Sequence, residues 1–395
     1  MALTLLPDPE ALVEAMAATG CKLVLSASGG GSAAIAQLAC TPGASGILLE
    51  AVLPSARAAV DGLLGGRQES YCSSKTARRL AVAAWQRARW LAESEGVPPD
   101  VAAGHAVGAA VTAGLKTTRP KRGRHRVIVA VQTARATRLV EAVLDKDARS
   151  RAEEESLAAA LVLSEIAAAC GAPAAAPPLR PTDRLDRDRC EPPTAWQALF
   201  VGSSHAAATG GLPAAAISGP AEGGLVFPGS FDPLHEGHLR MARIAEAIAG
   251  RPVAFEISIR NVDKPMLDFI EMRNRAAQFA ERPLWFTRAP TFLEKLDVFP
   301  RSTFVMGADT YARLADRRYY GGSAAAAAEA VETIAARAGG LIVFGRSQDG
   351  VYHDAASIEV PQVLRDVTSF VPERDFRLDV SSTELRRKHQ AEGEP

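Results

Sequence analysis

Short apolar runs alternate with segments of helical periodicity along most of the 395-residue chain. After residue 223 the apolar runs fall at 225–228, 254–259, 284–286, 303–306 and 341–344. Between them, apolar side chains recur every three or four positions at 235–249, 268–280, 311–315 and 323–338. Such runs are typical of buried strands and such spacing is typical of amphipathic helices, so this half predicts an α/β domain with a doubly wound parallel sheet.

The N-terminal half alternates in the same way, with less regular spacing. We expect a helix at 8–19, a strand at 22–26, a glycine-rich loop at 27–32 with an alanine-rich helix after it, and a long helix at 73–92. A further strand is expected at 127–131, and one or two helices are expected across 136–169. This pattern predicts a second α/β domain.

Composition changes between these halves. Proline and alanine dominate the stretch that follows residue 171, and charges alternate without periodicity at 183–189, as is typical of a linker. A chain of this length can bury two separate cores. We therefore expect a first domain at 1–171, a linker at 172–193 and a second domain at 194–395.

Charge and cysteine content narrow the class of protein. The formal net charge is zero, which argues against a nucleic-acid or membrane-surface partner. The five cysteines are odd in number and lack the Cys-x-x-Cys spacing, which favours a reducing compartment over a disulfide framework or zinc site. Without a membrane-length apolar run or a signal pattern, the sequence predicts a cytoplasmic protein. Oligomeric state is left open, with a homo-oligomer among the options.

The stretch with the clearest chemistry is Leu225-Val-Phe-Pro-Gly-Ser-Phe-Asp-Pro-Leu-His-Glu-Gly-His-Leu239. A strand that turns through a loop into a helix start offers backbone N–H groups and a positive helix end to an anion. His235 and His238 share the first helical turn, so both imidazoles can donate to phosphate oxygens. A zinc pair would be spaced as His-Glu-x-x-His, and we expect no protein-held metal here. A histidine pair that merely caps the helix is the alternative.

These residues resemble the signature of the nucleotidyltransferases that include mononucleotide adenylyltransferases, cytidylyltransferases and phosphopantetheine adenylyltransferase. The likeness rests on Gly229-Ser230-Phe231-Asp-Pro-Leu-His235-Glu-Gly-His238 and on a second motif, Ser381-Ser382-Thr383-Glu-Leu-Arg386. It implies a Rossmann-like domain in which Gly229, Ser230 and Phe231 shape the nucleotide site. The alternative for the second motif is a plain helix start with a capping box.

The resemblance implies transfer of a nucleotidyl group without a covalent enzyme intermediate. His235 and His238 would hold the α and β phosphates, while Ser382, Thr383 and Arg386 would grip the β and γ phosphates. Mg²⁺ would be carried mainly by the triphosphate.

Three further residues are candidates for this site. Lys264 follows a predicted strand, where ligands bind in open parallel sheets, and the family carries a similar lysine; an exposed loop lysine is the alternative. Asp309 matches a family Gly-x-Asp that contacts the mononucleotide or sugar, or it caps the helix that follows. Arg288, after another predicted strand, is a further phosphate contact.

The N-terminal half resembles the nicotinamide-nucleotide amidase domain, also called the CinA C-terminal domain, over about residues 8–171. Ser26-Ala-Ser28-Gly-Gly30 falls on that family's Glu-Ser-Cys-Thr-Gly-Gly motif, with Ser26 at the nucleophile and Ser28 beside it. The family's glutamate is Leu25 here, its cysteine is Ala27, and its lysine has no counterpart. Because a serine hydroxyl needs a base or ammonium for activation, we expect a retained fold with lost or altered amidase activity. A tight strand-to-helix turn is the alternative for the loop.

Together these motifs favour transfer of AMP from ATP to nicotinamide or nicotinate mononucleotide. Relatives of the amidase-like domain act on the same mononucleotide, which supports this substrate by association. Three alternatives stay open: a cytidylyltransferase for a phosphorylated alcohol, a non-catalytic nucleotide-binding sensor, and a working amidase.

Overall fold

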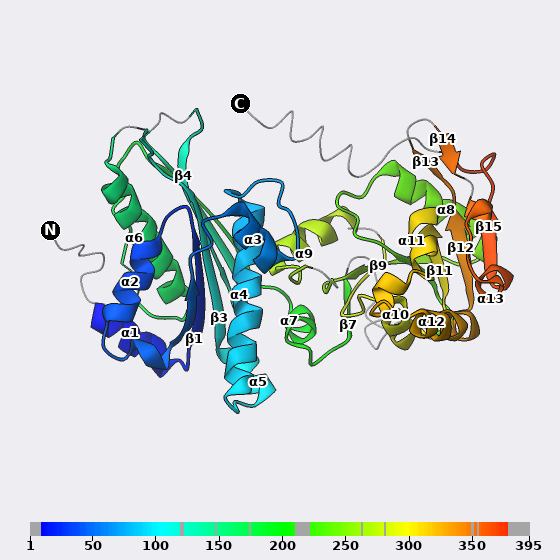
Figure 1. Cartoon of the computed structure of the whole chain (residues 1–395), viewed down its shortest axis with the longest axis horizontal. Helices are drawn as coiled ribbons and strands as arrows, with labels where there is room; N and C mark the ends of the chain where they lie inside the picture. Colours follow the sequence, from blue (N-terminus) through cyan, green and yellow to red (C-terminus); the bar gives the residue numbers. More distant parts are fainter. Residues whose placement is uncertain are drawn as a thin grey trace. The chain divides into compact units, whose positions relative to one another are not determined.

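The computed structural model describes residues 9–118, 122–146, 148–173, 175–209, 222–261, 264–279, 282–348, 351–353 and 355–377. The chain forms two compact units, each with its own sheet (Figure 1). The first unit comprises Met1–Gln197 with Asp263–Arg273, and the second comprises Ala198–Val262 with Asn274–Pro395. Within the described ranges, no helix is long and apolar enough to cross a membrane, and no cluster of three or more metal-ligating side chains occurs.

The first unit is built on a six-stranded sheet of order β2-β1-β3-β4-β5-β6. Its strands are β1 Lys22–Ser28, β2 Leu48–Val52, β3 Ala106–Gly114, β4 His125–Gln132, β5 Thr137–Leu144 and β6 Arg184–Cys190. β1 pairs in parallel with β2 and β3, whereas the pairs from β3 to β6 are antiparallel. Its helices are α1 Pro9–Ala18, α2 Ser32–Cys40, α3 Arg57–Leu64, α4 Ser74–Ser94, α5 Pro99–His105 and α6 Arg151–Ala169.

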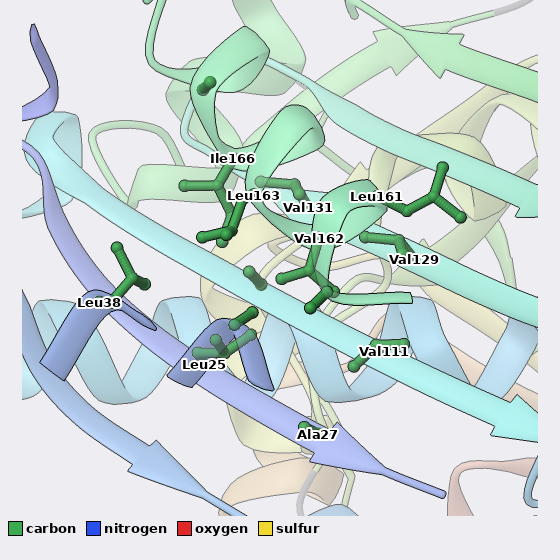
Figure 2. Packing of buried hydrophobic residues seen from close by; sticks show 14 of the residues in the cluster. Leu25, Ala27, Leu38, Val111, Val129, Val131, Leu161, Val162, Leu163 and Ile166 are labelled. Carbon is green, nitrogen blue, oxygen red and sulfur yellow. The ribbon is translucent and has the colours of Figure 1, made fainter. Parts of the chain in front are cut away.

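Helices cover both faces of this sheet because its central strands bury alternate side chains on each face. One face packs against α2 and α6, and Figure 2 shows Val129 and Val131 of β4 beside Val162 and Leu163 of α6. The opposite face packs against α4, and contact is so close that a Cβ on Gly108 would lie 2.1 Å from the Ala81 carbonyl oxygen. Only glycine fits at that position of β3.

Two expectations for this unit need correction. Part of the segment 136–169 predicted as helix is β5, in which buried and part-exposed positions alternate; only Arg151–Ala169 is helical. The second part of the predicted linker 172–193 is β6, an edge strand paired with β5 over seven residues. Its alternating charges face solvent, as edge strands require, and this pattern carries no hydrophobic signal of a strand.

Residues 264–273 also group with the first unit, although they follow a strand of the second. Asp268 begins helix α9 (Phe269–Ala276) and accepts from the Glu271 N–H at 3.0 Å. Arg78 of α4 pairs with Asp268 at 3.1 Å and with Glu271 at 3.2 Å. Burial raises the pKa of Asp268, and the Arg78 charge opposes that shift. The sequence pattern predicted the helix but not these contacts.

The second unit is built on a seven-stranded sheet of order β15-β12-β11-β8-β9-β10-β7. Its strands are β7 Ala206–Thr209, β8 Leu225–Pro228, β9 Val253–Ser258, β10 Leu284–Thr287, β11 Thr303–Gly307, β12 Gly340–Phe344 and β15 Thr368–Val371. All neighbouring pairs are parallel except β10 with β7. A separate hairpin joins β13 Arg346–Gln348 to β14 Val351–His353. The helices are α7 Thr194–Val201, which spans the boundary between units, α8 Glu236–Ala249, α10 Phe292–Val298, α11 Ala308–Arg313, α12 Ala324–Arg337 and α13 Gln362–Asp366.

The strand order places a reversal next to β8. From β8 the chain adds β9 and β10 on one side, and it then returns to add β11, β12 and β15 on the other. Ligands of open α/β sheets bind beyond the carboxyl ends of the strands at such a reversal. The predicted α/β fold with two domains and a doubly wound C-terminal sheet is therefore confirmed, and its strand order predicts a ligand site next to β8 and β11.

Candidate functional site

The loop after β8 is held in place by an aromatic ring. Phe231 has φ 44°, is 1% exposed, and packs edge-on against Phe227, Phe255 and Phe279 with centroid separations of 5.3–5.4 Å. A Cβ on Gly229 would lie 2.6 Å from that ring, so the loop requires glycine there. The Gly229 N–H also donates to the Glu256 carbonyl of β9 at 2.9 Å. The predicted loop residues Gly229 and Phe231 thus fix the shape of the loop, while Ser230 is exposed.

Two residues that the sequence did not single out support the loop from below. The buried Arg275 guanidinium donates to the Ser230 carbonyl at 2.5 Å and lies 3.5 Å from the Asp232 carboxylate. Gln278 accepts from the Leu234 N–H at 2.7 Å. Each lies more than forty positions from the motif residue that it contacts, so no local sequence signal connects them to it.

The two histidines face one another at the start of α8. Their rings are stacked, with centroids 3.7 Å apart and planes 25° from parallel. Nδ1 of His238 accepts from the His235 backbone N–H at 3.3 Å. The proton of a neutral His238 is therefore on Nε2, where it can donate to a ligand oxygen. Nδ1 of His235 is buried and has no partner in the described part of the chain.

Both imidazoles favour the neutral state. Burial lowers the pKa of His235. Burial, and then the nearby His235 charge, lower the pKa of His238 to about 3. Each ring therefore presents one N–H donor at neutral pH, and a bound anion would raise either pKa by favouring the charged form.

This pKa shift predicts an acid-sensitive fold. In the folded protein His238 has a pKa of about 3, whereas its usual value is 6.5. Between these two pH values the imidazole is therefore protonated in the unfolded chain and neutral in the folded protein. The contribution of His238 to the free energy of unfolding is fully present above pH 6.5 and is lost as the pH falls toward 3. We expect the free energy of unfolding of the second unit, measured in urea, to fall by about 1–2 kcal/mol from pH 7 to pH 5. The same loss in a His238→Gln variant would contradict this assignment.

Asp309 follows β11, the strand next to β8 at the reversal. Helix α11 begins at Ala308 directly after β11, with Gly307 at its N-cap, and Asp309 is exposed in the first turn. The alternative expectation that Asp309 caps this helix is therefore wrong, because the helix starts earlier than predicted. His238 and Asp309 follow β8 and β11, the two strands that flank the reversal. The predicted pair thus follows two adjacent strands of the sheet, as a shared site requires.

Arg288 contacts backbone carbonyls of its own unit. Its guanidinium donates to the carbonyls of Leu199 and Phe200 at 2.9 and 2.6 Å. These carbonyls belong to the last turn of α7, where the helix leaves acceptors without internal partners. Because Arg288 caps that helix, its arrangement does not favour the predicted phosphate contact.

Lys264 is an exposed side chain in the segment that groups with the first unit. Ser381, Ser382, Thr383 and Arg386 lie outside the described residues. The chain that leads to them is described up to residue 377, and it is held against α8. Arg240 donates to the carbonyls of Asp375 and Arg377 at 3.2 and 3.5 Å, and its guanidinium lies 5.6 Å from the centroid of the Phe376 ring.

The amidase-like residues of the first unit lie at the carboxyl end of β1. Ser26 is 2% exposed, and its hydroxyl has no partner among the described residues. Ser28 is partly exposed and donates to the Pro54 carbonyl at 3.0 Å. Neither hydroxyl contacts a basic group in the described structure, so neither has the activating partner that a serine nucleophile needs.

A carboxylate of the protein already fills the expected anion site at α2. Glu155 of α6 accepts from the Ser32 hydroxyl at 2.9 Å and from the Ala33 N–H at 3.1 Å. Arg151 pairs with the same carboxylate at 3.2 Å. Burial raises the pKa of Glu155, but the hydrogen bonds from residues 31–33 and the Arg151 charge outweigh it, and the net shift is downward.

The buried serine gives a prediction about stability. Replacing Ser26 by alanine removes a hydroxyl that has no partner, and an unsatisfied buried hydroxyl costs about 1–3 kcal/mol. We expect Ser26→Ala to leave the free energy of unfolding unchanged or to raise it. Ser28→Ala, which loses a hydrogen bond, is the matched control and should be less stable than Ser26→Ala. A large loss of stability in Ser26→Ala would contradict this view of the site.

The comparisons with known proteins match separate parts of the chain. A family model described as cytidylyltransferase-like matches residues 226–388, so the second unit contains a nucleotidyltransferase-superfamily domain. No curated protein matches the chain.

Solved structures of CinA superfamily proteins are similar to the N-terminal part. The competence-damaged protein from Escherichia coli is 18% identical, with 42% of this chain and 91% of that chain covered and a TM-score of 0.32. The competence or damage-inducible protein from Enterobacter asburiae is 15% identical, with 42% and 99% covered and a TM-score of 0.33. The protein CihA from Agrobacterium tumefaciens is 16% identical, with 41% and 96% covered and a TM-score of 0.31.

Proposed function

We propose that the second unit transfers AMP from ATP to nicotinamide or nicotinate mononucleotide and releases pyrophosphate. The observation that carries this proposal is the stacked pair of neutral histidines at the reversal between β8 and β11. The cytidylyltransferase-like match over the same residues supports the reaction class.

In this reaction the protein has to orient the two substrates and to stabilise the negative charge of the phosphates. A phosphate oxygen of the mononucleotide attacks the α-phosphorus of the triphosphate, and the bond to the bridging oxygen of pyrophosphate breaks. The nucleophile is already an anion, so no general base is needed. His235 and His238 would donate N–H groups to the α and β phosphates, where negative charge increases in the transition state.

The C-terminal motif would close the site on the side of the triphosphate. Residue 377 is held by Arg240, two positions after His238 on α8. The resemblance implies a role for Ser382, Thr383 and Arg386 as ligands of the β and γ phosphates. Mg²⁺ would arrive with the triphosphate, and Lys264 would contact the triphosphate or the transition state.

The identity of the base and the acceptor is the finer part of the proposal. Asp309, in the first turn of α11 after β11, would accept from a ribose hydroxyl of the mononucleotide, as the resemblance to adenylyltransferases implies. A cytidylyltransferase for a phosphorylated alcohol is the second candidate, and the description of the matching family favours it.

Pyrophosphate release from the purified full chain separates these candidates. The assay pairs ATP or CTP with nicotinamide mononucleotide, nicotinate mononucleotide or a phosphorylated alcohol. Release with ATP and a mononucleotide alone is the expected result. Release with CTP alone would replace the proposal by the second candidate, and tight binding without release under any pairing would indicate a non-catalytic nucleotide sensor.

We also propose that the first unit has lost amidase activity. The unactivated Ser26 hydroxyl and the Glu155 carboxylate at α2 support this. We expect no ammonia from nicotinamide mononucleotide. Ammonia release that disappears in Ser26→Ala would overturn the proposal.

A further inference from the structure

A cavity of about 460 Å³ lies in the first unit, at the end of the sheet opposite Ser26. It is bounded by the segments that precede β1 and β3 and by the turn between β4 and β5. Its thiol, imidazole and charged side chains are those of Cys21, His105, Arg135, Arg138, Cys170, Arg189 and Glu191. None of them takes part in the sites described above.

Two thiols meet in the wall of this cavity. Sγ of Cys170 lies 3.5 Å from Sγ of Cys21, although the two residues are 149 positions apart in sequence. Cys21 is 2% exposed and lies directly before β1, whereas Cys170 is partly exposed at the C-cap of α6. Both are free thiols. A disulfide needs a sulfur separation of about 2.05 Å, so the pair must approach by only about 1.5 Å.

The two thiols differ in reactivity. A hydrogen bond with the Cys21 thiol lowers the pKa of Cys170, against the smaller effect of burial. The same contact, followed by burial, raises the pKa of Cys21. Because the thiolate is the nucleophile in disulfide exchange, Cys170 is the attacking residue. Its partial exposure to the cavity is consistent with that role.

The cavity carries cationic groups that select the charge of a reagent. Arg138 pairs with Glu165 at 3.0 Å, and Arg189 pairs with Glu191. Arg135 is exposed, and its guanidinium has no partner among the described residues. This unpaired positive charge raises the local concentration of an anion beside Cys170.

We propose that Cys21 and Cys170 are a redox-active thiol pair that an anionic small-molecule disulfide oxidises through this cavity. The Cys170 thiolate attacks one sulfur of the reagent, and the first small thiolate leaves. The Cys21 sulfur then attacks Cys170 in the mixed disulfide, and its proton passes to the second departing thiolate. Two protein thiols are oxidised, and one small disulfide is reduced to two thiols.

The oxidised pair would join the start of β1 to the end of α6. This crosslink closes a chain segment of 149 residues, and crosslinks of long segments restrict the unfolded chain most. The pair is thus a modification site that would change the stability of the first unit in response to the redox state of its surroundings.

The test uses the full chain and two disulfide reagents of opposite charge. 5,5′-Dithiobis(2-nitrobenzoate) is dianionic and cystamine is dicationic. We expect the dianionic reagent to release two equivalents of thiol from this pair, and non-reducing peptide mapping to recover Cys21 joined to Cys170. In Cys21→Ser, and in Cys21→Ala should the serine variant not fold, Cys170 should instead keep the mixed disulfide.

Exposed Cys40 is the internal control for the intrinsic reactivity of each reagent. Relative to Cys40, Cys170 should prefer the dianionic reagent at least about fivefold at low salt, and this preference should shrink in high salt or in Arg135→Gln. A mixed disulfide that persists at Cys170 with Cys21 present would overturn the proposal. If Cys170 and Cys40 show the same preference between the two reagents, the cavity does not favour an anionic disulfide, and that part of the proposal is overturned.

Discussion

His238→Ala is expected to lower the rate of pyrophosphate release at least about a hundredfold, the usual effect of losing one preorganised charge stabiliser. The variant loses the Nε2 donor that the hydrogen bond from the His235 N–H orients. It also removes the ring that stacks on His235. The measurement is the steady-state rate of pyrophosphate release with saturating substrates.

The matched control is His205→Ala, which removes an exposed imidazole from the same unit. His205 contributes only its backbone carbonyl to the described contacts, as an acceptor for the Arg288 N–H. Its replacement should leave the rate unchanged. A His238→Ala enzyme with a near-normal rate would remove the histidine pair from the mechanism.

Lys295→Met is expected to destabilise the second unit by about 3–5 kcal/mol, because it leaves a buried carboxylate without its counter-ion. Lys295 of α10 donates to both oxygens of Glu256, at 2.9 and 2.7 Å, and to the Ala289 carbonyl at 2.8 Å. Glu256 is fully buried in β9, and its backbone carbonyl holds Gly229. The loss is measured by urea unfolding of the second unit.

The double variant Lys295→Met with Glu256→Leu provides the control. Replacing both members of a buried ion pair by apolar residues is often neutral, so the double variant should regain most of the lost stability. If the single variant is as stable as the wild type, or the double variant is less stable than the single one, the buried pair does not stabilise this unit as argued.

The fold of the second unit could be predicted because its signals are local. Each central strand is a short apolar run, and each helix between them has an apolar stripe, so the parallel sheet follows from the pattern. The loop around Gly229 and the His235–His238 pair could be predicted for the same reason, since the motif is continuous in sequence.

The remainder depends on contacts that join distant residues. β6 carries alternating charges on a sheet edge and was therefore expected to be a linker. Arg275 supports the motif from 45 positions away. Arg288 follows a strand, as a ligand-binding residue would, but its Nη1 donates to carbonyls in the last turn of α7. Cys21 and Cys170 have no spacing that marks a pair. In each case only the folded chain identifies the partner.

The most direct test of the central claim is the titration of His238 by NMR of the imidazole ring, with and without a saturating non-hydrolysable nucleoside triphosphate. In the free protein the pKa of His238 should be about 3, well below its usual 6.5. If the triphosphate lies on the imidazole N–H groups, its charge should raise that pKa by at least about one unit. An unchanged pKa in the saturated protein would mean that the phosphates do not bind at the histidine pair.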